Sequence, residues 1–450
     1  MLSDNGESKM MTQYEKVLGG EITPAIRTAA RRERVAPEQV RDELVRGTAV
    51  LPFNPVHHAL APAVVGRAFT TKVNANIGRS TEKSSNEEEI AKMHVALTAG
   101  TDFLMDLSVG PNLGELRRAM IVECPVPFGT VPIYEAFSRV DKNIEALSEN
   151  VLLEVIREQA EQGVDFMTIH AGLLRSHIPL AFKRMMGIVS RGGALIAEWM
   201  VHHERENPFF SRWKEILDIC HRYDVTISLG DGLRPGCLAD ASDEAQFAEL
   251  DVLGTLVKSC REHGVQVMVK GPGHLPFNQI EMNMKRQQQV CDGAPFFVLG
   301  PVVTDIALGY DHITSCIGAT MAAYHGAALL CCVTPSEHLG LPTAGEIKAG
   351  VMVSRIAAHA ADVAKSLPGA RAHDDEMSRA RKTFDWKKQF ELAIDGETAR
   401  QRYEQGRCRE EKEDYCSMCG KEFCAMRNSK SAATAKFMEV PDANLATESV

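Results

Sequence analysis

Three cysteines near the end of the chain, Cys416, Cys419 and Cys424, follow a C-x2-C-x4-C spacing. Closely spaced thiolates can hold one face of a metal centre, and Gly420 permits a tight turn between the ligands. A structural zinc site normally takes four ligands, and no histidine follows these cysteines. Three ligands without a fourth favour a [4Fe–4S] cluster with one open iron. The alternatives are a zinc knuckle that borrows Cys408, or exposed cysteines without a role.

A second group of reactive side chains stands at the ends of short apolar runs. Turns are polar in most proteins, but a plain turn does not need histidine or arginine at so many successive strand ends. In a parallel barrel the carboxyl ends of all strands open onto one face, so we expect one shared site there. The residues at these run ends are Asn74, Asn76, Met105, Asp106, Tyr134, His170, Ser190, Arg191, Gly192, Gly193, Asp231, Gly232, Leu233, Arg234, His274, Asp311, His312, Glu337 and His338.

The elements that must position these side chains alternate between short β-branched runs and amphipathic stretches, from about residue 70 to residue 335. Such alternation predicts βαβ units and a parallel sheet, hence an α/β fold. We predict a (β/α)8 TIM barrel; a doubly wound open sheet is the alternative, disfavoured because no GxGxxG follows the first run. Nine runs are one more than a barrel needs: 71–77, 103–107, 126–133, 166–169, 187–189, 225–229, 265–269, 296–303 and 328–333.

The rest of the chain frames this barrel. We predict a small N-terminal domain over 1–69 with a helix at 37–47, the barrel over 70–343, and a helical region over 344–427 that carries the cysteine motif. Residues 428–450 resemble a disordered, solvated tail. Helices are expected between the strands at 86–98, 149–162, 213–223, 243–263 and 278–291, and beyond them at 344–366, 374–395 and 396–413.

Composition narrows the class of protein. The 450 residues are 44% hydrophobic and 24% charged, with a formal net charge of −10, which argues against a nucleic-acid-coating protein. The first residues show no signal pattern, and the apolar stretch 319–333 is too short to span a bilayer, so we expect no membrane contact and a cytoplasmic location. Twelve cysteines are too few for a disulfide scaffold and should be thiols or metal ligands.

Ten short motifs then point in one direction. In chain order they are VNANIG, MDLS, GTVPIY, VDFMTIHAG, GIVSRGG, SLGDGLRPG, GPGH, YDHIT, VTPSEHLGLP and the terminal C-x2-C-x4-C. Together they resemble the radical S-adenosylmethionine (SAM) family of thiamin pyrimidine synthases, ThiC, nearly collinearly from about residue 10 to residue 427. Ten motifs in order are far more specific than any one of them.

This resemblance implies a (β/α)8 barrel, a homodimer, and a C-terminal segment that carries the cluster over the barrel mouth. The activity it implies is that of a radical SAM carbon–carbon lyase. An external electron donor reduces the [4Fe–4S] cluster held by the three cysteines, SAM is cleaved, and the 5′-deoxyadenosyl radical attacks 5-aminoimidazole ribotide.

The resemblance also assigns residues. Two histidines, His274 and His338, match the family's ligands for a mononuclear zinc or iron ion. The ribotide-binding positions are Asn76, Met105, Tyr134, His170, Ser190, Arg191, Gly192, Asp231, Gly232, Leu233 and Arg234, to which Lys270 and Phe297 are added. A ribotide phosphate needs backbone N–H groups and a guanidinium, which the segment 190–193 and Arg234 can supply.

Four positions depart from the family pattern. Lys270 replaces a glutamate and Phe297 a tyrosine, both at positions that normally touch the substrate; Leu308 replaces a proline and Cys332 an aromatic residue. Reversal of a charge in the pocket, with loss of a hydroxyl, favours the same substrate with a different outcome. We therefore hypothesise that Lys270 and Cys332 act in catalysis and redirect the rearrangement.

The predicted activity is conversion of 5-aminoimidazole ribotide to 5-hydroxybenzimidazole, a cobalamin lower-ligand precursor, as in the benzimidazole-forming branch of the family. The close alternative is synthesis of the hydroxymethylpyrimidine phosphate of thiamin from the same substrate. Two remote alternatives remain: a zinc-dependent barrel lyase or hydrolase with structural terminal cysteines, and a non-catalytic ribotide-binding protein.

Overall fold

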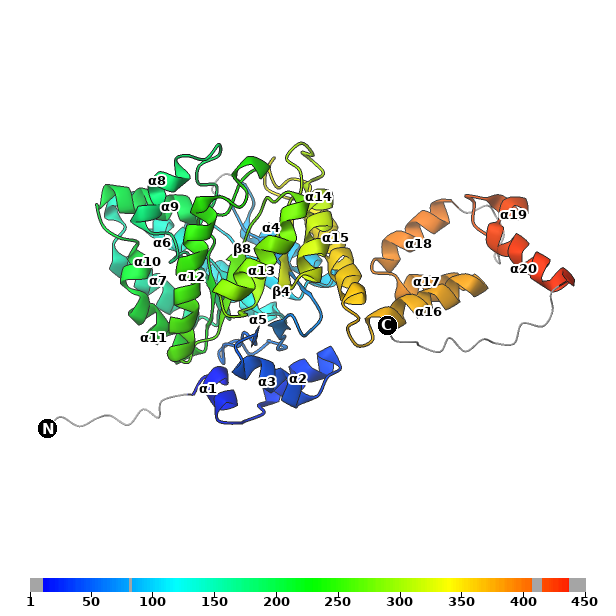
Figure 1. The fold of residues 1–450 in the computed structure, drawn as a ribbon, viewed down its shortest axis with the longest axis horizontal. Coiled ribbons are helices and arrows are strands. Elements are labelled where there is room, and N and C mark those ends of the chain that lie inside the picture. The colour runs from blue at the N-terminus through cyan, green and yellow to red at the C-terminus, as the bar shows by residue number, and fades with distance from the viewer. Residues whose placement is uncertain (1–10, 81–82, 407–414, 437–450) are drawn as a thin grey trace. The chain divides into compact units, whose positions relative to one another are not determined.

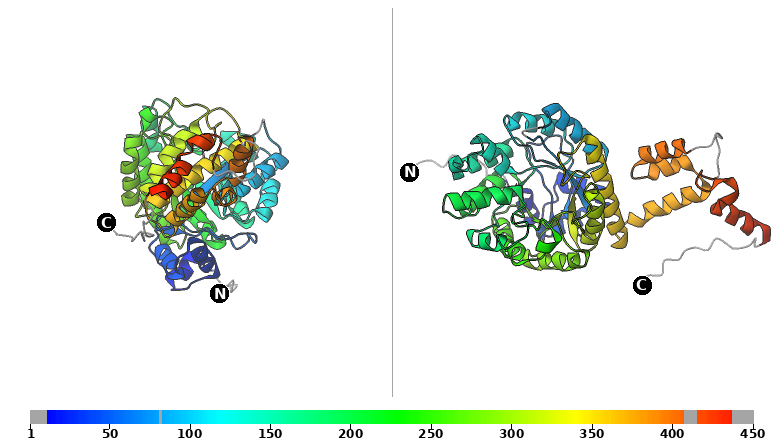
Figure 2. Two further views of the ribbon diagram at one scale, coloured as in Figure 1. Left: turned by 90° about the vertical axis from the view of Figure 1, so that its right-hand side faces the viewer. Right: turned by 90° about the horizontal axis from the view of Figure 1, so that it is seen from above.

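Eight parallel strands close into a barrel in the order β10-β3-β4-β5-β6-β7-β8-β9. In this computed structural model the description covers residues 11–80, 83–406 and 415–436. Figure 2, seen from above, shows helices in a ring around the strands, so the predicted (β/α)8 barrel is confirmed and the open sheet is excluded. The barrel strands are β3 (Lys72–Ile77), β4 (Phe103–Asp106), β5 (Phe128–Thr130), β6 (Phe166–Ile169), β7 (Thr226–Leu229), β8 (Val267–Gly271), β9 (Phe296–Leu299) and β10 (Ala327–Cys331).

The ninth candidate strand, residues 187–189, is a loop and lies outside the barrel. Gly187 has a φ of +64°, which breaks an extended run, and Ser190 already caps the next helix. The segment therefore delivers the chain to a helix start at the barrel mouth. Its two β-branched residues gave it the appearance of a strand.

The helices between the strands agree closely with the periodicity of the sequence. Ser85 and Glu88 form a capping box at the first of them, and Asp243 caps another. The helices around the barrel in Figure 1 are α4 (Asn86–Thr98), α5 (Leu113–Glu123), α6 (Pro132–Arg139), α7 (Glu149–Glu161), α8 (Ile178–Ala181), α9 (Arg191–His202), α10 (Pro208–Ser211), α11 (Trp213–Tyr223), α12 (Glu244–Glu262), α13 (Ile280–Val290), α14 (Asp311–Tyr324) and α15 (Ala344–Ala364).

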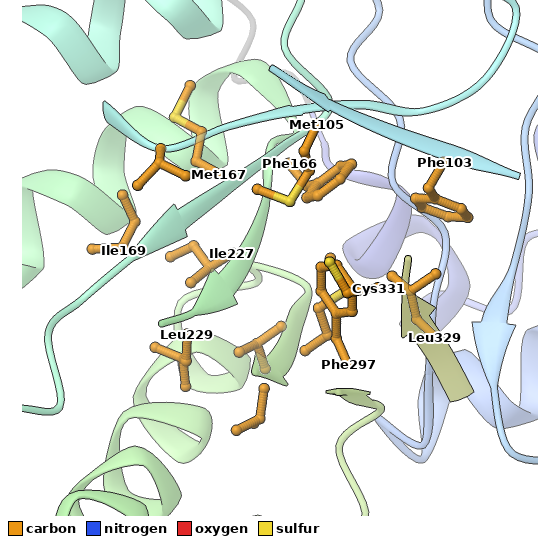
Figure 3. Close-up of a cluster of buried hydrophobic side chains, with 14 of the residues drawn as sticks. Phe103, Met105, Phe166, Met167, Ile169, Ile227, Leu229, Phe297, Leu329 and Cys331 are labelled. Atoms are coloured by element: carbon orange, nitrogen blue, oxygen red, sulfur yellow. The ribbon is translucent and has the colours of Figure 1, made fainter. Parts of the chain in front are cut away.

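A close-packed core fills the space enclosed by the strands. Figure 3 shows Phe103 and Met105 of β4 and Phe297 of β9 among these side chains, with Cys331 of β10 beside Phe297. Each of these side chains is at most 1% exposed. Large apolar groups at the centre of a barrel leave room for a ligand only at its mouth.

The N-terminal segment forms a small layer with its own apolar core. It holds the helices α1 (Gln13–Leu18), α2 (Pro24–Glu33) and α3 (Pro37–Val45), and β1 (Ala49–Val50) pairs antiparallel with β2 (Val65–Gly66). The helix predicted at 37–47 corresponds to α3. Buried ion pairs tie this layer to the barrel: Lys72 Nζ lies 2.8 Å from Glu33, and His57 Nδ1 lies 2.7 Å from Asp165.

The chain divides into two compact units between Leu367 and Pro368. Helix α15 belongs to the first unit, because it packs on α14, α4 and β3, so the helical region expected from residue 344 is split. The second unit contains α16 (Ala370–Thr383), α17 (Trp386–Leu392), α18 (Gly396–Gln405), α19 (Gly420–Phe423) and α20 (Ala425–Lys436).

Helix α20 also covers the start of the segment expected to be a disordered tail, a correction that its helix-forming alanines and lysines explain. Residues 437–450 of that tail and Cys408 lie outside the described residues. Within the parts of the chain that the structure describes, no helix is both long and apolar enough to cross a membrane.

Candidate active site

Two asparagines and a cysteine form the wall where β3 meets β10. Asn76 Nδ2 donates to Cys331 Sγ at 3.0 Å, and Asn74 Nδ2 donates to Asn76 Oδ1 at 2.9 Å. The register, which pairs Cys331 with Asn74, puts all three on one face of the sheet. The Oδ1 of Asn74 is buried and has no partner among the described residues, so this wall can still accept a hydrogen bond.

The second cysteine of this pair, Cys332, faces the other way. Its thiol is hydrogen-bonded to Ser354 of α15, and burial raises its pKa far above the usual range. Cys332 lines the edge of a cavity, but the sulfur beside Asn76 and near the charge of Lys270 belongs to Cys331. The structure thus puts the neighbour of the predicted catalytic cysteine in the wall, because side chains alternate along a strand.

The imidazole of His170, just after β6, is buried against two glycines. A Cβ on Gly192 would lie 2.3 Å from His170 Cε1, and one on Gly230 would lie 2.7 Å from His170 Cδ2. Burial, with the cations of Arg234 and Lys270, lowers the pKa of His170 to about 3. The ring is therefore neutral, and its Nδ1 has no partner among the described side chains, so it is available to a ligand.

The start of α9 and the loop after β7 pack backbone against backbone. A Cβ on Gly193 would lie 2.3 Å from the Gly232 carbonyl oxygen, so only glycine permits this approach. Ser190 caps α9 through its hydroxyl, which accepts from the Gly193 N–H at 3.2 Å. Asp231 and Arg234 end the loop, with Nη1 of Arg234 3.4 Å from Asp231 Oδ1.

Tyr134, near the start of α6, belongs to the same group. The guanidinium of Arg191 lies 4.9 Å from the centre of its ring. Burial raises the pKa of Tyr134, although Arg191 and Arg234 oppose the shift, so the phenol keeps its proton and can donate it in a hydrogen bond. The structure thus brings Tyr134, Arg191, Asp231 and Arg234 into one region.

Two residues that support this region have no motif in the sequence. Glu249 of α12 accepts hydrogen bonds from the Gly232 and Leu233 N–H groups, and Arg184 donates to the Leu233 carbonyl. Glu249 sits in a long amphipathic helix, where an acidic residue ordinarily faces solvent. Its position on the apolar side of that helix was the only available signal.

His274 and His338 meet at the mouth of the barrel. Their Nε2 atoms are 3.3 Å apart, while Nδ1 of His274 lies 2.9 Å from Asp305 and Nδ1 of His338 lies 2.9 Å from Asp311. A carboxylate at Nδ1 holds the proton there and leaves the Nε2 lone pair free. Burial, and His338 nearby, lower the pKa of His274 despite Asp305, which also favours the neutral ring.

This histidine pair fits a divalent metal. Two nitrogens bound to tetrahedral zinc at about 2.0–2.1 Å are roughly 3.3–3.4 Å apart, which matches the observed separation. No group of three histidine, cysteine or acidic side chains that could hold a metal occurs among residues 11–80, 83–406 and 415–436. A metal bound at this pair would therefore take two ligands from the described residues.

The three cysteines of the second unit lie on a short turn. Cys419 is exposed, Cys416 is half-buried, Cys424 is 7% exposed, and Gly420 between them has a φ of +67°. Three thiols on a turn that contains a glycine suit an iron–sulfur cluster by donor chemistry. The described positions do not gather the three sulfurs into a metal-binding group.

A cavity of about 600 Å³ opens at the carboxyl ends of β3, β4 and β10. Its lining contains Asn76, Arg191 and His338 of the predicted site, with Arg79 and Lys92 adding positive charge. It is large enough for a drug-sized ligand. Cys332 also lines it. The other predicted site residues are not among its lining residues: Met105, Tyr134, His170, Ser190, Gly192, Asp231, Gly232, Leu233, Arg234, Lys270, His274 and Phe297. Met105 and Phe297 are fully buried, and Lys270 lies over the Phe297 ring.

Comparison with known proteins agrees with this geometry. Residues 12–431 match the family described as "Radical SAM ThiC family". The chain belongs to this radical SAM ThiC family. It is thereby an enzyme of a family that implies an iron–sulfur cluster and SAM.

Curated relatives of this ThiC-family chain share one name. Phosphomethylpyrimidine synthase of Natronomonas pharaonis is 54% identical over 95% of this chain and 90% of its own length. The protein of the same name from Halobacterium salinarum is 53% identical over the same shares, and that of Haloarcula marismortui is 52% identical over 96% and 91%. These relatives favour the pyrimidine synthase over the benzimidazole synthase that the departures suggested.

Solved structures add little. A dihydropteroate synthase of Xanthomonas albilineans matches with a TM-score of 0.40 and 10% identity, over 71% of this chain and all of that one. A likeness at that level does not bear on function.

Proposed function

We propose that this ThiC-family protein is a phosphomethylpyrimidine synthase of thiamin biosynthesis. It converts 5-aminoimidazole ribotide to 4-amino-5-hydroxymethyl-2-methylpyrimidine phosphate. The observation that carries this proposal is 54% identity over 95% of the chain to a relative of that name. The closed barrel with polar groups converging at its mouth is consistent with it.

Cys416, Cys419 and Cys424 hold the [4Fe–4S] cluster in this proposal, and SAM is the cosubstrate. When bound, the cluster supplies the electron that cleaves SAM, and an external donor replaces that electron. The open end of the cysteine turn, with Cys419 exposed, suits entry of both. A homodimer acting in the cytoplasm is part of the same proposal.

The barrel residues bind and orient the ribotide. Arg191 and Arg234 are the cations for its phosphate, and the Arg191 and Gly192 N–H groups at the start of α9 add donors. The Gly193 N–H is already taken by Ser190, and the Gly232 and Leu233 N–H groups by Glu249.

The neutral His170, Tyr134 and Asn76 contact the imidazole and ribose, with Met105 and Phe297 as the apolar floor. His274 and His338 bind zinc or iron beside the substrate.

The benzimidazole synthase is the second candidate, and one observation favours it. Lys270 lies over Phe297, where the family pattern has glutamate and tyrosine. A cation on an apolar ring cannot accept or donate the hydrogen bonds of a carboxylate beside a phenol. The polar groups at this point of the barrel therefore differ from those of the family pattern.

One experiment separates the candidates. Protein with a reconstituted cluster is incubated without oxygen with 5-aminoimidazole ribotide, SAM and dithionite, and the products are identified by mass spectrometry. The proposal predicts hydroxymethylpyrimidine phosphate together with 5′-deoxyadenosine. 5-Hydroxybenzimidazole would establish the second candidate, and neither product would reject both.

A matched pair of variants tests the cluster. Cys419→Ser should remove bound iron and turnover, whereas Cys316→Ser, a half-buried cysteine on α14, should retain both. Retention of iron and turnover by Cys419→Ser would reject the proposed ligand set.

A further inference from the structure

Glu249 accepts hydrogen bonds from the backbone of the loop that carries Asp231 and Arg234. Its Oε1 accepts from the Gly232 N–H at 2.8 Å, and its Oε2 accepts from the Leu233 N–H at 2.7 Å. The residue is 3% exposed, and its carboxylate has both oxygens occupied by neighbouring amides. Such a two-point hydrogen bond fixes the peptide plane between the two residues.

Arg184 donates a hydrogen bond to a backbone carbonyl of the same loop. Its Nη2 donates to the Leu233 oxygen at 2.7 Å, while Nε and Nη2 each contact an oxygen of Asp243 at 2.7 Å. The Arg184 side chain is 1% exposed, and that of Asp243 is 27% exposed, so the guanidinium is shielded from solvent while its partner reaches the surface. Asp243 also caps α12, the helix that carries Glu249. The hydrogen bonds of Glu249 and of Arg184 to the loop therefore both depend on the position of α12.

The loop also packs directly against the start of α9, so the positions of the two segments are coupled. The Gly232 oxygen lies 2.3 Å from the place that a Cβ of Gly193 would take, so a shift of the loop toward α9 would press on the first turn of that helix. Arg191 and Gly192, two of the predicted ribotide contacts, stand in that turn.

We infer that Glu249 and Arg184 are positioning residues for the ribotide, which hold the 231–234 loop with its amides turned away from the substrate. The loop then reaches the substrate only through the Asp231 and Arg234 side chains. This inference rests on the proposed function, because the loop's role in ribotide binding is part of that proposal.

The ionisation of Glu249 gives the inference a pH signature. Burial raises its pKa to about 8; the Leu233 and Gly232 N–H groups and Arg184 oppose the shift, and Asp231 adds to it. A protonated carboxyl has one oxygen fewer to accept an N–H group. Loop order, and with it ribotide affinity, should fall as the pH drops through 8.

The test compares Glu249→Gln with Glu262→Gln, an exposed position on the same helix. Glutamine keeps one acceptor but points an NH2 group at the second amide. We expect Glu249→Gln to raise KM for the ribotide at least about tenfold at pH 8.5, with kcat within about threefold. The control should match the parent protein, and the KM of Glu249→Gln should lose its dependence on pH between 7 and 9.

Amide hydrogen exchange of the peptide that contains Gly232 and Leu233 gives an answer independent of turnover. Faster exchange in Glu249→Gln supports the inference, and unchanged exchange with unchanged KM overturns it. If the parent protein does not bind the ribotide, the proposed function is rejected. The exchange measurement then still shows whether Glu249 holds the loop. If Glu249→Gln does not fold, Arg184→Lys applies the same two measurements from the carbonyl side.

Discussion

The Nζ of Lys270 lies 4.6 Å from the centre of the Phe297 ring, and the two residues are register partners on β8 and β9. The charge of Lys270 also acts on His170 and Asp231. It adds to the burial that lowers the pKa of His170, and it opposes the burial that raises the pKa of Asp231. Lys270 is thus the cation between the apolar floor of the barrel and its polar wall.

Lys270→Glu should weaken ribotide binding. It adds a further carboxylate near Asp231 and removes a cation, so we expect KM to rise at least about tenfold. Adding Phe297→Tyr supplies a phenol that can donate to the new carboxylate and should recover part of the loss. Steady-state kinetics checks this, with exposed Lys258→Glu as the control. An unchanged KM and product ratio in the double variant would mean that neither position affects the substrate.

Cys331 and Cys332 should separate activity from stability. The Cys331 thiol sits 3.0 Å from Asn76 in the site wall, so Cys331→Ala should lower kcat/KM at least about tenfold. The Cys332 thiol faces Ser354, and Cys332→Ala should instead lower the free energy of unfolding by about 1–2 kcal/mol, with kcat/KM within about threefold. The reverse pattern, measured by kinetics and urea unfolding, would restore the catalytic role first predicted for Cys332.

Gly192→Ala should displace His170. The new Cβ would lie 2.3 Å from Cε1 of the imidazole, and the ring also packs closely on Gly230, where a Cβ would lie 2.7 Å from Cδ2. We expect kcat/KM to fall about 100-fold or more, with a lower melting temperature. Gly345→Ala, at an open helical position where the new Cβ would lie 4.0 Å from the Thr343 hydroxyl oxygen, is the control and should retain activity. Full activity in Gly192→Ala would show that His170 can move without consequence.

The barrel and most of its helices could be predicted because each strand and helix has its own periodicity. Residues 86–98 and 213–223 correspond to α4 and α11 at both ends. Residues 187–189 were wrongly predicted as a strand, because a short apolar run has the same residue types in a half-buried loop as in a short strand. The eight other strands close the barrel among themselves, so residues 187–189 have no strand to pair with. The sequence pattern does not contain this information.

The site was less accessible from sequence. Motifs named His170, Arg191 and Asp231, but the side to which a side chain points depends on strand register, which is why Cys331 rather than Cys332 faces Asn76. Glu249 was missed because its partners are backbone amides, which leave no trace in residue types.

Asp311→Asn should lower the affinity for a divalent metal. The carboxylate holds Nδ1 of His338 at 2.9 Å and so raises the basicity of the facing Nε2. Asparagine keeps an acceptor but loses the charge, and we expect about tenfold weaker zinc binding. Competition with a chromophoric chelator measures this on the cluster-free protein. Asp375→Asn, at a partly exposed position on α16 where the carboxylate pairs with Arg371, is the control. Equal affinity in both variants would exclude a metal at the histidine pair.

Asp224 should make stability depend on pH. Burial raises its pKa to about 7, against which the Gln13 N–H and Lys16 act only in part. The folded state therefore binds this proton more tightly than the unfolded state, and the stability it contributes is complete below about pH 4 and lost as the pH rises to 7. Asp224→Asn keeps the acceptor for Gln13, and asparagine tolerates the φ of +54° found there.

The variant should gain stability relative to the parent protein by about 2–3 kcal/mol between pH 5 and pH 8, since each pKa unit corresponds to about 1.4 kcal/mol. Urea unfolding at the two pH values measures the difference. Asp218→Asn, exposed on the same helix, should change equally at both. A stability difference between Asp224→Asn and the parent that does not vary with pH would mean that the carboxyl is already ionised at pH 5, and that its hydrogen bond to Gln13 outweighs its burial.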